Sequence, residues 1–227
     1  MADPRLIVFD VDGTLVDSQH NIVHAMTAAW EAHGLGTPSA DAVRRVVGLA
    51  LEDAVAALLP DGCGVPAARV ADSYRQAFFD LKARPGFDEP LFPGLRAALD
   101  AVETDNTLLG VATGKSRRGL EGLLERHGLA GRFVTLQTPD DGPGKPDPAM
   151  LRRALDATGA DAAATVMVGD TVYDMRMARA AGTHALGVAW GYHPADELHA
   201  GGAHAVAADG ADLARLTNHL LEVRSCA

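Results

Sequence analysis

Asp10 and Asp12 stand one residue apart in the segment Asp-Val-Asp-Gly-Thr-Leu at residues 10–15, directly after four apolar residues. A short apolar run of this kind is typical of a buried parallel strand, and open α/β sheets bind ligands at the carboxyl ends of their strands. Two carboxylates this close repel each other unless a cation or a raised pKa relieves the repulsion. Because oxygen-only ligands favour Mg²⁺, the segment predicts a magnesium site at a strand end.

The same two carboxylates have the chemistry of a covalent catalyst. Asp10 can attack an electrophile, as carboxylates do in aspartyl-phosphate chemistry. Asp12 can exchange protons with the leaving group and with the attacking water. Gly13 permits a tight turn and a close backbone approach to a phosphate. A turn that merely ends a strand is the alternative, but the whole segment is far more specific than an Asp-Gly pair.

Two later turns carry groups that can hold a phosphate. Thr113 and Gly114 follow the apolar run at residues 108–112, where a hydroxyl, backbone N–H groups and a helix start can bind phosphate oxygens. Lys145 lies in the proline-bounded turn Gly-Lys-Pro-Asp-Pro and can neutralise both Asp10 and a transferring phosphoryl group. A surface lysine is the alternative, but lysines are scarce among the 20 basic residues, which favours a specific role.

A second pair of aspartates follows a later strand. Asp170 comes just after the apolar run at residues 165–168, and Asp174 comes one helical turn further on. Because residues i and i+4 share a helix face, both carboxylates can point toward one metal ion. Asp170 can also be the N-cap of the helix that follows it.

The elements that must position these groups alternate along the chain. Short apolar runs predict strands at residues 6–9, 108–112, 133–136, 165–168, 184–188 and 205–207. Helical patterns lie between them, with predicted ends at Gly128, Gly159 and Gly182. Strands that alternate with helices predict right-handed crossovers and a doubly wound parallel sheet, that is, an α/β, Rossmann-like core.

Residues 16–88 interrupt this alternation. Four amphipathic helical patterns follow one another there without a convincing strand, and Pro-Gly pairs at residues 85–86 and 93–94 indicate the return to the core. We therefore expect residues 1–15 and 89–227 to form the core, and residues 16–88 to form an inserted all-helical cap.

Composition limits the classes of partner. The chain has 227 residues, 48% of them apolar, with a net charge of −10, which argues against a nucleic-acid or anionic-membrane surface. No apolar run is long enough to span a bilayer, and no signal-peptide pattern opens the chain. Cys63 and Cys226 are too few for a disulfide framework. We expect a cytoplasmic protein with free thiols, either a monomer or a homodimer.

These motifs, in this order, resemble the haloacid dehalogenase-like hydrolase superfamily, and within it the helical-cap phosphatases similar to phosphoglycolate phosphatase. The resemblance covers essentially the whole chain, although an asparagine is common in place of Gly114. It implies a Mg²⁺ cofactor, Asp10 as nucleophile and metal ligand, and Asp12 as general acid/base that also binds the metal through its backbone carbonyl. It further implies Asp170 as a metal ligand and Asp174 either as a ligand or as a residue that supports the ligands. The resemblance also implies that Thr113 and Lys145 hold the phosphate.

The leading hypothesis is a phosphomonoesterase that acts on a small phosphate ester such as 2-phosphoglycolate. The alternatives are a sugar phosphomutase of the β-phosphoglucomutase type and a non-catalytic phosphate-binding regulatory protein. A dehalogenase or phosphonate hydrolase is disfavoured, because neither needs an acid at Asp12. His193 can lie on the rim of the site or simply pack, and the sequence does not choose which cap residue meets the substrate. The cap candidates are Arg44, Arg45, Tyr74, Arg75 and Lys82.

Overall fold

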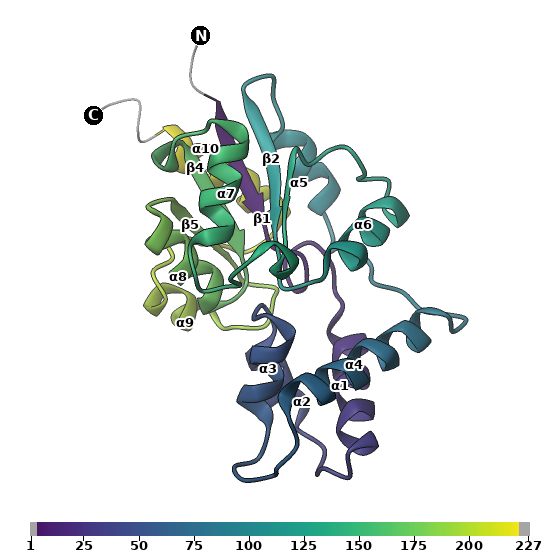
Figure 1. Ribbon diagram of the computed structural model, residues 1–227. Coiled ribbons are helices and arrows are strands. Elements are labelled where there is room, and N and C mark those ends of the chain that lie inside the picture. The colour runs from purple at the N-terminus through teal and green to yellow at the C-terminus, as the bar shows by residue number, and fades with distance from the viewer. Residues whose placement is uncertain (1–3, 223–227) are drawn as a thin grey trace.

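The computed structural model describes residues 4–222, and its centre is a parallel sheet flanked by helices (Figure 1). Within these residues the strand order is β3-β2-β1-β4-β5-β6, all parallel, so β1 lies in the middle between β2 and β4. The strands are β1 (Arg5–Phe9), β2 (Thr107–Ala112), β3 (Thr135–Gln137), β4 (Thr165–Gly169), β5 (His184–Val188) and β6 (Ala205–Ala207). This is the doubly wound α/β core that the alternating pattern predicts.

Helices cover both faces of this sheet (Figure 1). They are α5 (Leu95–Val102), α6 (Arg117–Arg126), α7 (Ala149–Thr158), α8 (Val172–Ala181), α9 (Ala195–Ala200) and α10 (Gly210–Glu222). Side chains alternate along β1, so Ile7 and Phe9 pack with α5, α6 and α10, while Leu6 and Val8 pack with α7, α8 and α9. Each face therefore has its own apolar core, and the strand ends are held rigidly between two layers.

The four remaining α-helices of the described residues form a separate body below the sheet in Figure 1. They are α1 (Gln19–Ala32), α2 (Ala40–Val46), α3 (Leu51–Leu58) and α4 (Ala67–Lys82). Their own apolar cluster is centred on Trp30, Val43, Val55 and Val70. We call this body the cap. It lies against the loops at the carboxyl ends of the strands.

Several boundaries differ from the sequence pattern. The strand expected at residues 133–136 begins two residues later, at β3 (Thr135–Gln137). Phe133 lies outside the strand and packs edge-on against Phe9, with ring centroids 6.4 Å apart. Helices α5, α9 and α10 were not foreseen as separate elements. The predicted stops at Gly159 and Gly182 are confirmed, since both glycines cap their helices with positive φ angles of 68° and 77°.

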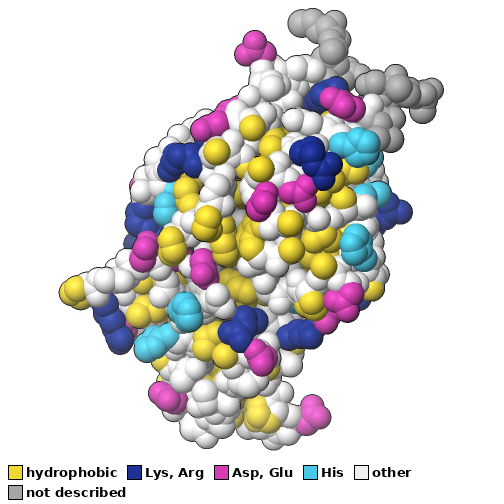
Figure 2. All heavy atoms as spheres, turned by 180° about the vertical axis from the view of Figure 1, so that it is seen from behind, with side chains coloured by type: hydrophobic (Ala, Val, Ile, Leu, Met, Phe, Trp, Pro, Cys, Tyr) yellow, Lys and Arg dark blue, Asp and Glu magenta, His cyan; other side chains and the backbone are white. Residues whose placement is uncertain are grey.

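The face drawn in Figure 2 carries single Lys and Arg side chains interspersed with Asp and Glu, without a broad basic patch on its described part. Within residues 4–222, no helix has both the length and the apolar character needed to cross a membrane. Cys63 is a free thiol, whereas Cys226 lies outside the described residues.

Candidate active site

The sequence motifs converge at the carboxyl end of the central strands. Asp10 and Asp12 follow β1, Thr113 follows β2, and Asp170 follows β4. Lys145 reaches the same place from the loop before α7, although its backbone lies outside the sheet. The sheet order explains the meeting, because β2 and β4 are the two neighbours of β1.

Lys145 is the central cation of the cluster. Its Nζ lies 2.7 Å from Oδ1 of Asp10 and 2.6 Å from Oδ1 of Asp174, and all three side chains are buried. Burial alone lowers the pKa of Lys145, but the two carboxylates outweigh burial, so the pKa is raised and the side chain stays charged. An ammonium in this place is fixed and cannot be solvated.

The carboxylates outnumber the cations here. Candidate ligand oxygens of Asp10, Asp170 and Asp174 all lie within 4.8 Å of one another, and Lys145 offsets only one of the three charges. Burial raises the pKa of Asp10 to about 7, although the nearby Lys145 partly opposes this rise. Burial and the negative charge of Asp10 raise the pKa of Asp170 well above its usual range. Oδ2 of Asp10 is buried without a hydrogen-bond partner among the described residues. A divalent cation fits this oxygen-lined site and would balance its two remaining negative charges.

Asp174 has less freedom to bind a metal than Asp170. Its Oδ1 pairs with Lys145, while its Oδ2 accepts hydrogen bonds from the backbone N–H and the hydroxyl of Thr171 at 3.1 and 2.7 Å. Thr171, and not Asp170, is the N-cap of α8, so Asp170 does not take the N-cap role that the sequence left open as an alternative. With both oxygens engaged, the geometry favours a supporting role for Asp174.

Asp170 is oriented from two sides. Thr14 donates its hydroxyl to Oδ1 at 2.8 Å, and the backbone N–H of Tyr192 donates to Oδ2 at 2.9 Å. Gly13 passes so close, with a φ of 89°, that a Cβ there would lie 2.3 Å from Oδ2 of Asp170. The glycine of the first motif is therefore required by this close approach as well as by its turn.

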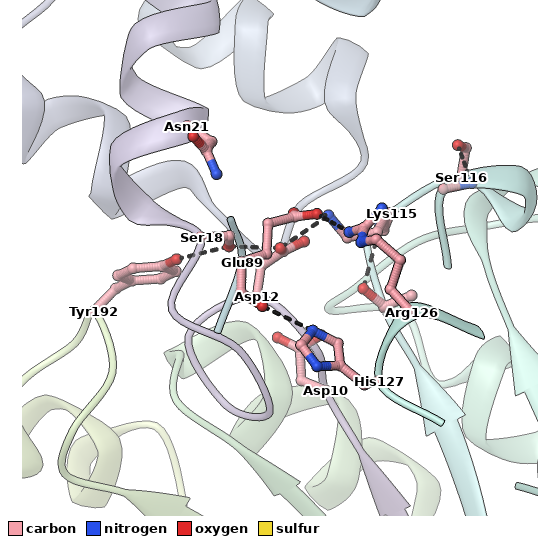
Figure 3. Close-up of polar contacts among 12 residues, drawn as sticks. Asp10, Asp12, Ser18, Asn21, Glu89, Lys115, Ser116, Arg126, His127 and Tyr192 are labelled. Atoms are coloured by element: carbon pink, nitrogen blue, oxygen red, sulfur yellow. Dashed lines mark hydrogen bonds and ion pairs between the residues drawn. The ribbon is translucent and has the colours of Figure 1, made fainter. Parts of the chain in front are cut away.

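Asp12 lies at the boundary between the core and the cap. Its Oδ1 accepts a hydrogen bond from the Ser18 hydroxyl at 2.6 Å and pairs with Nζ of Lys115 at 3.0 Å (Figure 3). Lys115 also pairs with Glu89 at 3.3 Å. Burial lowers the pKa of Lys115, but Asp12 and Glu89 outweigh burial, so the pKa is raised.

The sequence reasoning missed Glu89 and gave Lys115 no role. The scarcity of lysine, which singled out Lys145, singles out Lys115 equally well, so the sequence did contain a signal for Lys115. For Glu89, an isolated carboxylate in the segment that leads from α4 back to the core, the sequence holds no comparable signal.

The cap closes over Thr113 and Gly114. Thr113 is buried and accepts from the backbone N–H of Lys115 at 3.2 Å. A Cβ on Gly114 would lie 2.5 Å from the carbonyl oxygen of Leu49, in the loop between α2 and α3. The missing side chain at Gly114 therefore lets the cap approach the core. A cavity of about 1150 Å³ lies between the cap and the core, and it reaches Asp10, Asp12 and Thr113.

His193 links the core to the cap and is not among the described residues that line the cavity. Its Nδ1 accepts from the backbone N–H of Val172 at 3.3 Å, and its Nε2 lies 3.3 Å from the carbonyl oxygen of Arg45. The hydroxyl of Tyr173 donates to the same carbonyl at 3.1 Å, and Arg45 pairs with Glu197 at 2.5 Å. These contacts hold α2 of the cap on the start of α8 and on α9.

The family model for haloacid dehalogenase-like hydrolases matches residues 7–188, from β1 to β5 and across the cap. The chain belongs to the haloacid dehalogenase-like hydrolase family.

Curated relatives match over most of their length. The chain is 38% identical over 198 residues to a probable phosphatase IndB of Dickeya dadantii, covering 86% of this chain and 85% of that protein. It is 34% identical to a phosphoglycolate phosphatase of Rhodospirillum rubrum, covering 83% and 81%. Among solved structures, a hydrolase from Pseudomonas syringae has a TM-score of 0.80 at 27% identity, covering 97% of this chain and 99% of that one.

Proposed function

We propose that the protein is a Mg²⁺-dependent phosphomonoester hydrolase that works through an aspartyl-phosphate on Asp10. One observation carries this proposal: Asp10 is buried beside Asp170 and a fixed Lys145, with Asp12 close by at the edge of the cavity. The names of the relatives, which include several phosphatases, support the same class of reaction.

Each residue has a role that its position supports. Mg²⁺, held by Asp10, Asp170 and the backbone carbonyl of Asp12, would shield the phosphoryl charge from the carboxylates. Lys145 neutralises Asp10 and the phosphoryl group, and Asp174 keeps Lys145 in place. Thr113 and the backbone N–H of Gly114 hold phosphoryl oxygens.

The reaction has two balanced steps. Asp10 forms a bond to phosphorus while the ester P–O bond breaks, and Asp12 gives its proton to the departing alcohol oxygen. Water then attacks phosphorus, its proton returns to Asp12, and the Asp10–phosphorus bond breaks to release phosphate. The cap excludes bulk water during both steps.

The cavity supports a substrate that carries a second anionic group. Lys82 of the cap and Lys115 of the core both place Nζ 5.3 Å from the ring centroid of Phe78. Burial and then the neighbouring Lys115 lower the pKa of Lys82, so a substrate carboxylate would relieve this repulsion. Related proteins act on phosphoglycolate or N-acetylmuramic acid 6-phosphate. We take 2-phosphoglycolate as the first substrate to test.

Phosphate release from p-nitrophenyl phosphate tests the reaction class. We expect activity that needs Mg²⁺ and disappears in Asp10→Asn. Activity that survives this substitution would overturn the role of Asp10. A wild-type protein without Mg²⁺-dependent turnover would overturn the proposal and favour a binding protein. A panel of carboxylated and uncarboxylated phosphate esters then ranks the substrates. A phosphoenzyme that water hydrolyses slowly but that returns its phosphoryl group to a sugar phosphate would instead show a phosphomutase.

A further inference from the structure

Glu89 is a wholly buried carboxylate with two cationic partners. It lies between α4 and α5, and its side chain has no solvent exposure. One oxygen pairs with Lys115 at 3.3 Å, and the other pairs with Arg126 at 2.5 Å. The Glu89 carbonyl oxygen lies 2.8 Å from Nε2 of His127, so backbone and side chain are both tied to the end of α6 (Figure 3).

A contribution to the stability of the fold is a weak explanation for these buried ion pairs. Removing charges from water costs several kcal/mol per ion, and buried ion pairs often stabilise a fold no better than apolar residues would. Asp12 and Glu89 are balanced by Lys115 and Arg126, and only Arg126 is substantially exposed, at 41% of its side chain. The arrangement instead fixes one atom in place, the Nζ of Lys115, next to Asp12.

The two oxygens of Asp12 are therefore unlike each other. Oδ1 meets both the Ser18 hydroxyl and Nζ of Lys115. Oδ2 has no hydrogen-bond or ion-pair partner within residues 4–222, and Asp12 lines the cavity. An oxygen that already faces two donors has little room for a proton of its own.

We propose that Glu89 and Lys115 are positioning residues, which hold Oδ1 of Asp12 so that Oδ2 carries the proton transferred in catalysis. This inference rests on the proposed phosphatase reaction. The Oδ2–H bond breaks as the departing alcohol oxygen gains the proton and its bond to phosphorus breaks. In the second step Oδ2 takes a proton from water as the water oxygen bonds to phosphorus, which restores Asp12.

Glu89 gives the cleaner test of the two residues. Lys115 lines the cavity and is able to touch substrate, whereas Glu89 is absent from the described residues that line it. A loss caused by Glu89→Gln therefore acts through neighbouring residues such as Lys115 and not through contact with substrate. Lys115→Met removes the ammonium itself, and Lys115→Arg keeps a cation there. Arg117→Met is the matched control, because Arg117 lies at the start of α6 and pairs with Asp141 instead.

The experiment compares two esters in single turnovers at saturating substrate with Mg²⁺. The alcohol of 2-phosphoglycolate is a poor leaving group that needs a proton, whereas p-nitrophenolate leaves without one. For the alkyl ester we expect Glu89→Gln and Lys115→Met to slow alcohol release on the order of 10- to 100-fold. Release of p-nitrophenolate should change much less, and Glu89→Gln should leave KM for both esters nearly unchanged. Lys115→Arg should recover part of the loss, and Arg117→Met should behave as wild type.

Equal losses for both esters in folded Glu89→Gln, or a loss confined to KM, would overturn the positioning role. Thermal unfolding of each variant identifies the folded ones, and Lys115→Met with Lys115→Arg decides the question if Glu89→Gln does not fold. A wild-type protein that turns over neither ester contradicts the proposed function instead. If 2-phosphoglycolate is not turned over, another alkyl ester from the panel takes its place.

Discussion

Nζ of Lys145 lies 2.7 Å from Oδ1 of Asp10, with both side chains buried at the end of the central strand. The proposed nucleophile is therefore paired with a cation that the protein itself supplies. This pair is shared, because Asp174 lies 2.6 Å from the same ammonium. Removal of Lys145 would leave two buried carboxylates without their shared cation.

Lys145→Met should abolish turnover and destabilise the protein at neutral pH. Breaking a buried ion pair by removing one partner typically costs about 3–5 kcal/mol, since the other charge stays buried. Denaturant unfolding at neutral pH in EDTA measures this loss. Arg117→Met, which removes a partly exposed cation, should change stability by less than about 1 kcal/mol. Equal stability of both variants would contradict the pairing.

The metal-free protein should lose stability as the pH rises toward neutrality. Burial raises the pKa of Asp10 from 3.8 to about 7, so between these values the folded state binds more protons than the unfolded state. The stabilisation is complete below the lower value and is lost as the pH passes the upper one. Thermal unfolding in EDTA across this range should show the fall, and Asp10→Asn should flatten it. A melting temperature that rises with pH in EDTA would oppose this account.

Added Mg²⁺ should raise the melting temperature, and more strongly at higher pH, because its ligands must be deprotonated. Asp170→Asn should remove most of this increase. Asp174→Asn should keep much of it while losing turnover, because Asp174 acts through Lys145. If Asp174→Asn loses the Mg²⁺ response as completely as Asp170→Asn, Asp174 is a direct ligand.

Gly114→Ala should weaken catalysis by holding the cap away from the core. The added methyl group would lie 2.5 Å from the Leu49 carbonyl oxygen, which is backbone and cannot swing aside. We expect kcat/KM to fall about tenfold or more, because misplacement of about 1 Å can cost about 100-fold. Gly122→Ala, on α6, is the control, since a methyl group there meets nothing within 4 Å. Small-angle scattering should show a more open particle for Gly114→Ala alone.

Much of the core and of the metal cluster could be predicted from the sequence. Apolar runs define buried strands, and residues at the ends of neighbouring parallel strands must meet, so Asp10, Thr113 and Asp170 were foreseen together. Lys145 was foreseen from its stiff turn and from the scarcity of lysine.

The contacts between the cap and the core were harder to predict from the sequence. Contacts between Glu89 and Lys115, or between Gly114 and Leu49, join segments that no periodicity relates to each other. Such contacts depend on how two separately packed bodies meet, and the pattern within each body does not contain that information.

The central claim is that the phosphoryl group passes through Asp10. Mixing the protein with p-nitrophenyl phosphate and Mg²⁺, quenching in acid within the first turnover and sequencing peptides by mass spectrometry tests it most directly. We predict one phosphoryl group on the peptide that spans β1, located at Asp10 and absent from Asp10→Asn. A phosphoryl group on another residue, or turnover by Asp10→Asn at the wild-type rate, would contradict the account.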